Sequence, residues 1–572
     1  MQSFAVREEI PEQAHEILKA YPEIVRRLLW HRGIQSAGDA ALFLAPDYER
    51  DLHDPFEIHD MDRAVTRILS AIDAREKIVI FGDYDADGIP GSVVLHDFFK
   101  KIGYENFSNY IPHRYREGYS LNEGAIEAFA ADGVSLVITV DSGITDIAEV
   151  ALANKLGIDV IVTDHHLPLV GTDGVQKLPS AYAIINSKKD DCGYAFDQLC
   201  GAGTAFKLVQ ALLKARDFGI APGWEKWLLD VVGISTVADM VPLVGENRAL
   251  AYFGLKVLRK SPRPGIHALL KKLRMNQRTL SEDDIGFMIA PRINAASRMG
   301  EPIDAFSLLS TNDLLKAGAL AEHLQKLNDQ RKGKVAAIVR EAKKRLAARL
   351  AGGGLREVIV VGDPEWMPGI LGLAANSLME SYGRPVFVWG REGSEQIKGS
   401  CRSNNGVSIV ALMSRTPEGT FLDLGGHTDA GGFSIAQEKI HTLEDELVIA
   451  YSALSSREGE RQVLCDAMLS MDDMTDAFYE EIARLAPFGI GNLKPIFLFE
   501  NIYPLRVERF GKGKEHLKLI FQTSRGELPA ISFFAPEEWR PATGVSLTVA
   551  ASLEKSFFGG RAELRLRIVD MI

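Results

Sequence analysis

The stretch Ile78-Val79-Ile80-Phe81-Gly82-Asp83-Tyr84-Asp85-Ala86-Asp87-Gly88 joins an apolar, strand-like run to three carboxylates within five residues. Two later runs end in a similar way. The run Leu136 to Val140 is followed by Asp141, and Ile161-Val162-Thr163 is followed by Asp164-His165-His166. Because loops at the carboxyl ends of neighbouring parallel strands converge on one crevice, residues far apart in sequence can meet there. The three runs therefore predict a parallel sheet with one polar site at its edge.

The polar residues behind these runs are suited to a metal site. Taken singly, an Asp before Gly is a common turn, and a His pair after a strand is often structural. Clustered carboxylates, however, raise one another's pKa unless a cation neutralises them, and carboxylates with imidazoles suit Mg²⁺ or Mn²⁺. Another acid, Asp239, lies near the end of an apolar segment. We predict a two-metal centre, suited to phosphoester hydrolysis, that draws on Asp83, Asp85, Asp87, Asp141, His165, His166 and Asp239.

The order of predicted elements indicates several domains, since 572 residues are too many for one core. Over residues 60–310, β-rich runs alternate with helical stretches, which is typical of a doubly wound α/β domain. A long amphipathic helix over 311–354 begins at Thr311-Asn312-Asp313 and stops at three glycines. A second α/β domain follows over 355–455. Short β-like segments over 456–572 predict a small barrel of the OB type, and residues 1–59 form an N-terminal extension.

Composition narrows the class of protein. The apolar fraction of 46% and the charged fraction of 25% are ordinary for a soluble protein. A net charge of −12 argues mildly against a general nucleic-acid coat but leaves room for a local basic path, because metal-binding acids count in this sum. The four cysteines show no zinc-type pairing, and no run resembles a signal or a membrane span. We therefore expect a cytoplasmic protein without membrane contact.

The ordered motifs also resemble a known family. The series Gly82 to Gly88, Val140 to Gly143, Asp164 to His166 and Val237 to Asp239 resembles the four motifs of the DHH phosphoesterase superfamily. Within it, the chain is similar to the RecJ-like single-strand-specific exonucleases over nearly its whole length. Further matching segments are Gly201 to Phe206, Pro291 to Arg298, Lys398 to Ser403, Gly425 to His427 and Pro487 to Asn492. The third and fourth of these resemble the substrate-binding DHHA1 domain.

The resemblance implies a metal-dependent exonuclease that degrades single-stranded DNA from the 5′ end to mononucleotides, in DNA repair and recombination. It implies two Mn²⁺ or Mg²⁺ ions, with Asp141 bridging and Asp83 and His166 as ligands or as their hydrogen-bonding partners. The direct ligands implied are Asp85, Asp87, Asp141, His165 and Asp239. Several superfamily members place a His where this chain has Phe81, which leaves the first ion one nitrogen short. A single-strand-binding protein and a helicase are the protein partners that the resemblance implies.

Substrate contacts are expected in three places. The residues alone leave Arg114 equally open as a surface-loop arginine, but the resemblance favours phosphate binding. With Ser400 and Arg402 in a glycine-bounded loop, Arg114 is expected to form a 5′-phosphate pocket, because a guanidinium can grip phosphate in a bidentate way. Arg292, Asn294 and Arg298 are expected along the strand path, although helix packing is an equal alternative for Asn294. His427 is expected to contact the substrate. In the barrel, cations interleaved with aromatics suit an unpaired strand, and those expected to contact nucleic acid are Arg509, Lys512, Lys514 and Lys518.

Two other functions compete with this interpretation. A phosphodiesterase for short oligonucleotides or cyclic dinucleotides would use the same chemistry, but such relatives are compact two-domain proteins, so the segment after Pro487 favours a long polymer. A non-catalytic DHH scaffold of a replication complex is the other alternative. Such scaffolds lose ligand residues, whereas this chain retains nearly all of them.

Overall fold

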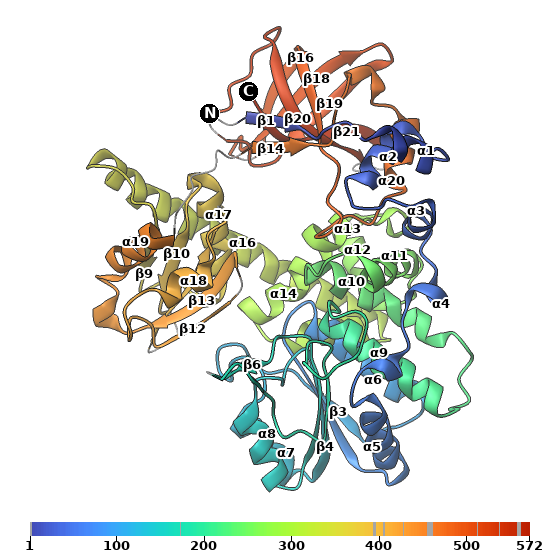
Figure 1. Cartoon of the computed structure of the whole chain (residues 1–572). Coiled ribbons are helices and arrows are strands. Elements are labelled where there is room, and N and C mark those ends of the chain that lie inside the picture. Colours follow the sequence, from blue (N-terminus) through green and yellow to red (C-terminus); the bar gives the residue numbers. More distant parts are fainter. Residues whose placement is uncertain are drawn as a thin grey trace. The chain divides into compact units, whose positions relative to one another are not determined.

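The structure is a computed structural model. It describes residues 3–171, 173–392, 396–403, 406–426, 428–454, 462–511, 513–536, 538–557 and 562–572. The chain forms two compact units (Figure 1). The first comprises Met1–Ser297, Glu301–Gln325 and Arg461–Ile572, and the second comprises Arg298–Gly300 and Lys326–Glu460. Among the helices in the described ranges, none combines the length and the apolar character needed to cross a membrane.

The first unit contains the predicted doubly wound α/β domain. Its parallel sheet has the order β3 (Phe107–Tyr110), β2 (Lys77–Gly82), β4 (Val134–Val140), β5 (Asp159–Thr163) and β8 (Ala183–Ile185). Helices lie on both faces of this sheet (Figure 1). One face carries α5 (Met61–Asp73), α6 (Gly88–Lys101) and α9 (Gly201–Ala215), and the other carries α7 (Glu123–Ala131) and α8 (Ile147–Lys155).

Local patterns explain these elements. The central strands β2, β4 and β5 are buried along almost their whole length, as expected for parallel strands covered on both faces. Helix α5 buries residues spaced three and four apart, namely Met61, Ala64, Val65, Ile68 and Ala71, which form one apolar stripe. In chain order the strands run 2-1-3-4-5, so the strand order reverses between β2 and β4. Ligands of such sheets bind at this switch point, outside the carboxyl ends of the strands.

Helices complete this domain. Helix α10 (Leu229–Ala238) is buried almost all round and crosses α11 (Gly245–Leu258) at two facing glycines. A Cβ built on Gly233 would lie 2.7 Å from the Cα of Gly254, so the close crossing requires a glycine there. The carboxyl end of α10 presents Asp239. A single π-helical turn, Ile285–Ile289, runs directly into α14 (Ala290–Met299).

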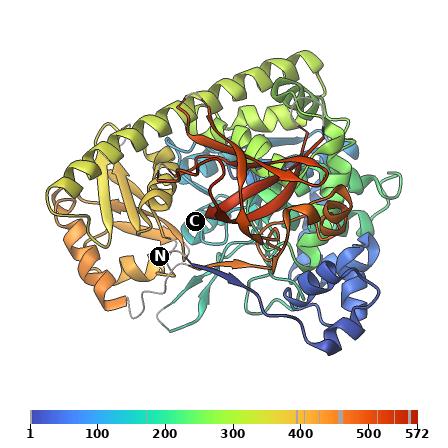
Figure 2. The same ribbon diagram turned by 90° about the horizontal axis from the view of Figure 1, so that it is seen from above.

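The long connecting helix is confirmed as α16 (Leu314–Ala351), a single continuous helix (Figure 2). Its amino end is capped as predicted, because Asp313 Oδ1 accepts hydrogen bonds from the backbone N–H groups of Leu315 and Lys316 at 2.7 and 3.1 Å.

The second unit holds a mixed five-stranded sheet. Its order is β12 (Asp423–Gly426), β13 (Ala430–Ile435), β11 (Ile397–Arg402), β10 (Val386–Gly390) and β9 (Ile359–Asp363). The later part of α16 packs with α17 (Leu371–Tyr382) in one core, and α18 (Ile409–Ser414) packs with α19 (Leu443–Leu454) in another. The second α/β domain is therefore confirmed as an α/β unit.

The C-terminal part of the chain forms one seven-stranded sheet. Its order is β15 (Ala467–Met468), β16 (Phe497–Ile502), β20 (Leu547–Ser556), β21 (Glu563–Met571), β19 (Gly526–Ser532), β18 (His516–Thr523) and β17 (Pro504–Phe510). These strands correspond to the short β-like segments that the sequence predicts over residues 456–572.

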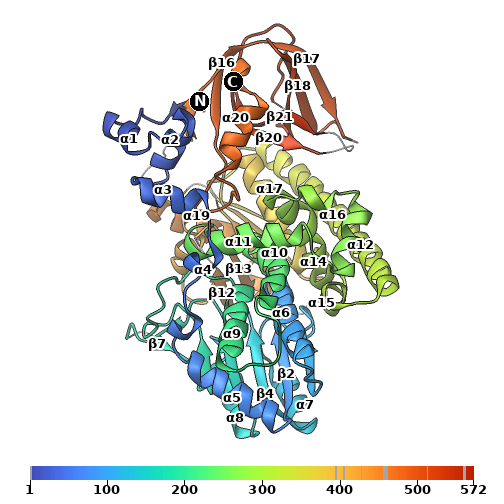
Figure 3. The ribbon, with the colours of Figure 1, turned by 90° about the vertical axis from the view of Figure 1, so that its right-hand side faces the viewer.

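The N-terminal segment belongs to the core of this C-terminal domain. Helices α1 (Glu12–Ile17), α2 (Glu23–Trp30) and α3 (Ala37–Leu44) lie beside the C-terminal strands and α20 (Asp476–Ala483) (Figure 3). Leu18, Val25 and Leu28 share one apolar cluster with Phe497 and Phe521. In addition, β1 (Ser3–Val6) pairs in parallel with β14 (Gln462–Cys465). Short amphipathic helices cannot bury their apolar faces alone, so the two ends of the chain depend on each other.

Candidate metal centre

Four segments bring the predicted ligands together in the first unit. Asp83, Asp85 and Asp87 lie in the turn from β2 to α6, and Asp141 directly follows β4. His165 and His166 follow β5 by two and three residues, and Asp239 caps the carboxyl end of α10. All four segments meet at the switch point between β2 and β4.

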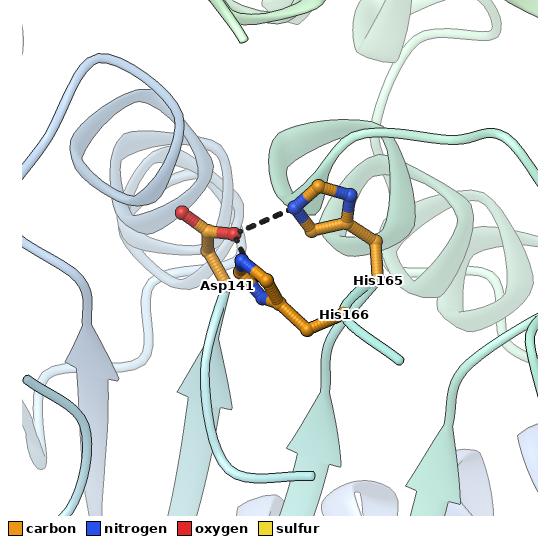
Figure 4. A group of neighbouring side chains, drawn as sticks. All are labelled: Asp141, His165 and His166. Carbon is orange, nitrogen blue, oxygen red and sulfur yellow. Dashed lines mark ion pairs between the residues drawn. The ribbon is translucent and has the colours of Figure 1, made fainter. Parts of the chain in front are cut away.

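The distances define overlapping groups of ligand atoms. His165 Nε2 lies 3.1 Å from Asp141 Oδ1, 3.5 Å from Asp87 Oδ2 and 3.7 Å from Asp239 Oδ2. In a second group, ligand atoms of Asp83, Asp85 and Asp141 all lie within 4.8 Å of one another. Figure 4 shows the Asp141 carboxylate facing both His165 and His166, whose Nδ1 is 3.8 Å away. Asp141 is thus common to both groups.

The chemistry of this donor set fits divalent cations. Among the described residues, four buried atoms of the centre make no hydrogen bond: Asp83 Oδ1, Asp141 Oδ1, and both ring nitrogens of His165. Burial, and then repulsion by neighbouring carboxylates, raises the pKa of Asp83, Asp141 and Asp239 well above the ordinary value. Burial lowers the pKa of His165 to about 4, so the ring is neutral. A neutral imidazole among crowded carboxylates is a ligand set that bound cations would stabilise.

Surrounding groups fix the orientation of the ligands. The Asp87 carboxylate accepts hydrogen bonds from the N–H groups of Gly201 at 2.6 Å and Ala202 at 2.8 Å, at the amino end of α9, and from the Ser235 hydroxyl. Asp164 lies 2.8 Å from His166 Nδ1. Burial opposes its ionisation, but the bond to His166 prevails and lowers the pKa of Asp164 to about 2. An ionised carboxylate only accepts, so His166 carries a proton on Nδ1.

Two backbone features place Asp141. Its φ of 61° is left-handed, a conformation that residues other than glycine adopt rarely and often at functional sites. Gly201 packs directly against it, and a Cβ at this position would lie 2.5 Å from the Cβ of Asp141. The sequence matched the segment Gly201 to Phe206 to a family motif. It did not predict that Gly201 packs against Asp141 or that Ser235 donates a hydrogen bond to Asp87. A glycine opening a helix next to a predicted site is the signal that could have indicated them.

Two residues near the centre have clear structural settings. Phe81 is fully buried and stacks on Tyr110 with ring centroids 5.5 Å apart, so it belongs to the core below the centre. Asn294 Oδ1 accepts the N–H of Ala86 at 2.8 Å. Asn294 therefore holds the turn that carries the three aspartates, a role that neither of its sequence alternatives described.

The predicted arginines differ in their surroundings. The Arg114 guanidinium lies 4.8 Å above the ring of Tyr84 and electrostatically favours ionisation of Asp83 and Asp85. Arg292 is only 3% exposed, and it donates to the carbonyls of Phe287 and Met288 in the π-helical turn. This setting favours a structural role for Arg292. In the second unit, Arg298 donates to the carbonyl of Gly369 at 2.5 Å.

The prediction of a loop around Ser400 and Arg402 is wrong, because both residues lie on strand β11. The pairing of β11 with β10 and β13 explains the difference, since it buries Cys401 on one face and leaves Ser400 and Arg402 together on the other. The glycine at 399 is required by packing, because a Cβ there would lie 2.0 Å from the ring of Phe433. His427 lies outside the described residues.

The basic residues predicted to contact nucleic acid in the C-terminal domain have different surroundings. Arg509 donates to the carbonyls of Pro536 and Trp539, at 3.0 and 2.7 Å. It lines a cavity of about 440 Å³ together with Lys514, Trp539 and Arg540. Lys518 lies on β18 opposite Glu508. Lys512 lies outside the described residues.

Three known protein families match this chain in the same order as its domains. The chain matches the DHH family, N-terminal domain, over residues 77–236, the DHHA1 domain over 355–448 and the RecJ OB domain over 465–570. The single-stranded-DNA-specific exonuclease RecJ of Bacillus subtilis is 35% identical over 552 residues, which cover 96% of this chain and 67% of that protein. RecJ of Salmonella typhimurium is 33% identical over 592 residues, covering 99% and 98%. The chain belongs to the RecJ family.

A solved RecJ structure agrees with this assignment. RecJ from Thermus thermophilus in complex with Mn²⁺ superposes with a TM-score of 0.81 at 28% sequence identity, covering 100% of this chain and 79% of that one. The α/β architecture with its C-terminal OB domain is therefore the RecJ architecture.

Proposed function

We propose that this protein is a metal-dependent exonuclease that degrades single-stranded DNA from the 5′ end to mononucleotides, in DNA repair and recombination. One observation carries the proposal: two groups of potential ligands share the buried carboxylate of Asp141 at the switch point of the sheet. The similarity to single-stranded-DNA-specific exonucleases over nearly the whole chain supports the choice of substrate.

The residues of the centre have distinct tasks. Asp87, Asp141, His165 and Asp239 would hold one Mn²⁺ or Mg²⁺ ion, and Asp83, Asp85 and Asp141 a second. Bound ions of this kind activate a water nucleophile and stabilise charge on the phosphate and the leaving oxygen. The bond between His166 and Asp164 outweighs burial and raises the pKa of His166. A proton on this ring, whose side chain is 38% exposed, would be available to a phosphate oxygen.

The terminal phosphate is the second element of the proposal. In the first unit Arg114 supplies a guanidinium group near the metal centre, and in the second unit Ser400 and Arg402 on β11 supply a hydroxyl and a guanidinium group. Burial lowers the pKa of Arg402, which remains a cation at neutral pH. Such groups hold a 5′-phosphate more tightly than an unphosphorylated end.

Arg402→Ala is expected to weaken binding of 5′-phosphorylated strands by about 1.5–3 kcal/mol, because it removes a charge-assisted contact. Binding of 5′-hydroxyl strands should change little. Competition between the two kinds of end measures this selectivity. Arg356→Ala, which removes an exposed arginine paired with Asp445 in the same domain, should keep the selectivity of the wild type. Equal selectivity in Arg402→Ala and wild type would place the pocket elsewhere.

The C-terminal domain offers a surface for a longer strand. Phe533 and Phe534, which are 38% and 77% exposed, pack with His516. Arg567 lies 4.2 Å above the ring of Phe533. Exposed aromatic faces beside cations are suited to stacking bases and neutralising a backbone. We infer that this surface holds single-stranded DNA, and that the cavity lined by Lys514 and Arg540 in the same domain contacts its backbone.

Phe534→Ala is expected to weaken binding of long single strands by about 1–3 kcal/mol, the usual contribution of one stacked base. Lys514→Ala should reduce the slope of log affinity against log salt by about one, because one phosphate contact is lost. Fluorescence anisotropy with a labelled strand measures both effects, and Lys155→Ala on the distant surface of α8 is the control. Unchanged affinity and slope in both variants would contradict the role of this surface.

A time course with 5′-labelled and 3′-labelled single strands in Mn²⁺, Mg²⁺ or EDTA tests the proposed activity. We expect mononucleotides released from the 5′ end, and no release in EDTA. Preference for very short oligonucleotides or cyclic dinucleotides would favour a phosphodiesterase instead. Absence of hydrolysis by folded protein that binds metal would favour a scaffold.

Two further expectations belong to this proposal. A single-strand-binding protein and a helicase are the partners expected of an enzyme that consumes unwound strands. We also infer a reducing, cytoplasmic setting, because all four cysteines have free thiols.

A further inference from the structure

One tyrosine outside the ligand set contacts the metal centre directly. Tyr119 lies in the segment between β3 and α7, and its side chain is 46% exposed. Its hydroxyl donates a hydrogen bond to the backbone carbonyl of Asp141, with an O···O distance of 3.1 Å. The same oxygen lies 3.3 Å from Nδ1 of His166. One hydroxyl therefore touches the residues that follow both β4 and β5.

The contact with Asp141 falls at a strained point. Asp141 has the left-handed φ of 61°, and its carboxylate is the one shared by both ligand groups. A backbone in this conformation persists only where its surroundings hold it. The N–H of Asp141 donates to the carbonyl of Thr163 at 2.9 Å, and Tyr119 satisfies its carbonyl. Both backbone groups of Asp141 are thus fixed, which sets the direction of the carboxylate.

The segment that carries Tyr119 is itself held under strain. Ser120 has a left-handed φ of 71°, and its hydroxyl donates to the buried carboxylate of Asp146. The N–H of Leu121 donates to the same Asp146 oxygen at 3.0 Å. Glycine is easily accommodated at positive φ, but serine is not. The two hydrogen bonds to Asp146 therefore hold Tyr119 against the metal centre, although Ser120 adopts a strained backbone conformation.

The ring of Tyr119 links the metal centre to Arg114, the candidate phosphate-binding residue, through the ring of Tyr84. It packs edge-to-face with Tyr84, with centroids 6.4 Å apart, and Tyr84 carries the Arg114 guanidinium above its own ring. It also packs edge-to-face with the ring of His166, with centroids 5.9 Å apart. Arg114, Tyr84, Tyr119 and His166 form one continuous wall beside the centre.

We propose that Tyr119 is a positioning residue, whose hydroxyl holds the Asp141 turn and the His166 ring in the arrangement that binds the cations. This inference rests on the proposed function for its effect on catalysis, but its effect on metal binding does not depend on DNA. The ring serves mainly as a support for Tyr84 and Arg114. The hydroxyl sets the ligand geometry.

Tyr119→Phe separates these two parts, because it removes the hydroxyl and keeps the ring. Groups that orient metal ligands typically contribute about 10- to 100-fold in metal affinity or activity. We expect Tyr119→Phe to weaken Mn²⁺ binding by about this factor, measured without DNA from the free-ion electron paramagnetic resonance signal. With single-stranded DNA, kcat should fall by a similar factor while KM changes little. Tyr182→Phe, which alters an exposed tyrosine beneath Arg63 in the same domain, should match wild type.

Wild-type Mn²⁺ affinity and kcat in Tyr119→Phe would overturn the proposal. If Tyr119→Leu then raised KM, the ring would be a substrate surface and the hydroxyl would have no positioning role. Thermal unfolding shows that each variant is folded before binding is measured. If the wild type proved to lack nuclease activity, the proposed function would fail, whereas the comparison of Mn²⁺ affinities would still decide the role of Tyr119.

Discussion

Asp141→Asn is expected to lower the rate of single-strand hydrolysis by about 10³-fold or more, because it removes the one carboxylate shared by both ligand groups. Asparagine suits this test, since it tolerates the left-handed φ of 61° and nearly preserves the volume of the side chain. Without added metal, Tm should stay equal or rise, because the variant removes a buried charge that Asp83, Asp85 and Asp87 repel. His165→Ala should lose activity to a similar extent.

Metal linkage gives this prediction a second readout. Cations that bind only the folded state raise Tm as their concentration rises. Added Mn²⁺ should therefore stabilise the wild type more than Asp141→Asn. Asp132→Asn, which alters a mostly exposed carboxylate paired with Lys77 in the same domain, should behave as wild type in both assays. Near-normal turnover by Asp141→Asn at saturating Mn²⁺, or an unchanged Mn²⁺-induced shift in Tm, would contradict the assignment.

The largest expected effect on stability concerns Arg248 on α11. Its guanidinium is buried and donates to the backbone carbonyls of Leu485 and Ala486 at 2.9 and 3.1 Å. It also donates to the carbonyls of Pro487 and Phe43. Burial, aided by the charge of Arg32, lowers the pKa of Arg248 to about 10, so the group stays charged at neutral pH. One side chain thus joins the α/β domain, the N-terminal helices and the segment that enters the OB domain.

Arg248→Met should reduce the free energy of unfolding by about 3 kcal/mol or more, because it keeps an apolar stem but leaves several buried carbonyls without a donor. Urea unfolding measures the loss. Arg248→Lys should recover only part of it, since an ammonium cannot reproduce the planar fork of donors. Arg63→Met removes an exposed arginine paired with Asp60 and should cost about 1 kcal/mol or less. A loss no larger in Arg248→Met than in Arg63→Met would show that the junction does not depend on this residue.

The structure also changes how the C-terminal domain can be tested. Removing the chain from about Glu500 onward would expose Leu18, Val25 and Leu28 of the N-terminal helices, because these residues share the C-terminal core. Loss of DNA binding in such a truncation would not separate contact with DNA from unfolding. Point variants at exposed positions such as Phe534 avoid this difficulty.

Residues that mark strand ends were predictable because their pattern is local. An apolar run followed by Asp83, Asp141 or His165 identifies the end of a buried parallel strand, and parallel strands align their carboxyl ends. The convergence of these residues therefore follows from a short-range pattern and one rule of topology. The helix beginning after Asp313 was predictable for a similar reason, since its cap and its apolar stripe are both contained in the segment itself.

Other residues were not predictable because their partners lie far away in sequence. Arg292 was expected along the path of the DNA strand, but its guanidinium donates to the carbonyls of a π-helical turn. Ser400 and Arg402 resembled a loop because of the glycine at 399, which in fact makes room for the ring of Phe433 on a neighbouring strand. Tyr119 showed no signal at all, because its role depends on the carbonyl of Asp141.

The sequence by itself determined the order of domains, the family and the set of ligand types, because these depend on apolar periodicity and on motifs within single segments. Tertiary structure alone decided which ligand atoms come together at the metal centre and which segments share a core. It also decided which arginines donate hydrogen bonds to backbone carbonyls of the protein. Contacts between segments such as Tyr119 and Asp141, or Arg248 and Leu485, depend on the directions of side chains across neighbouring elements. Those directions are set only when the strands and helices pack.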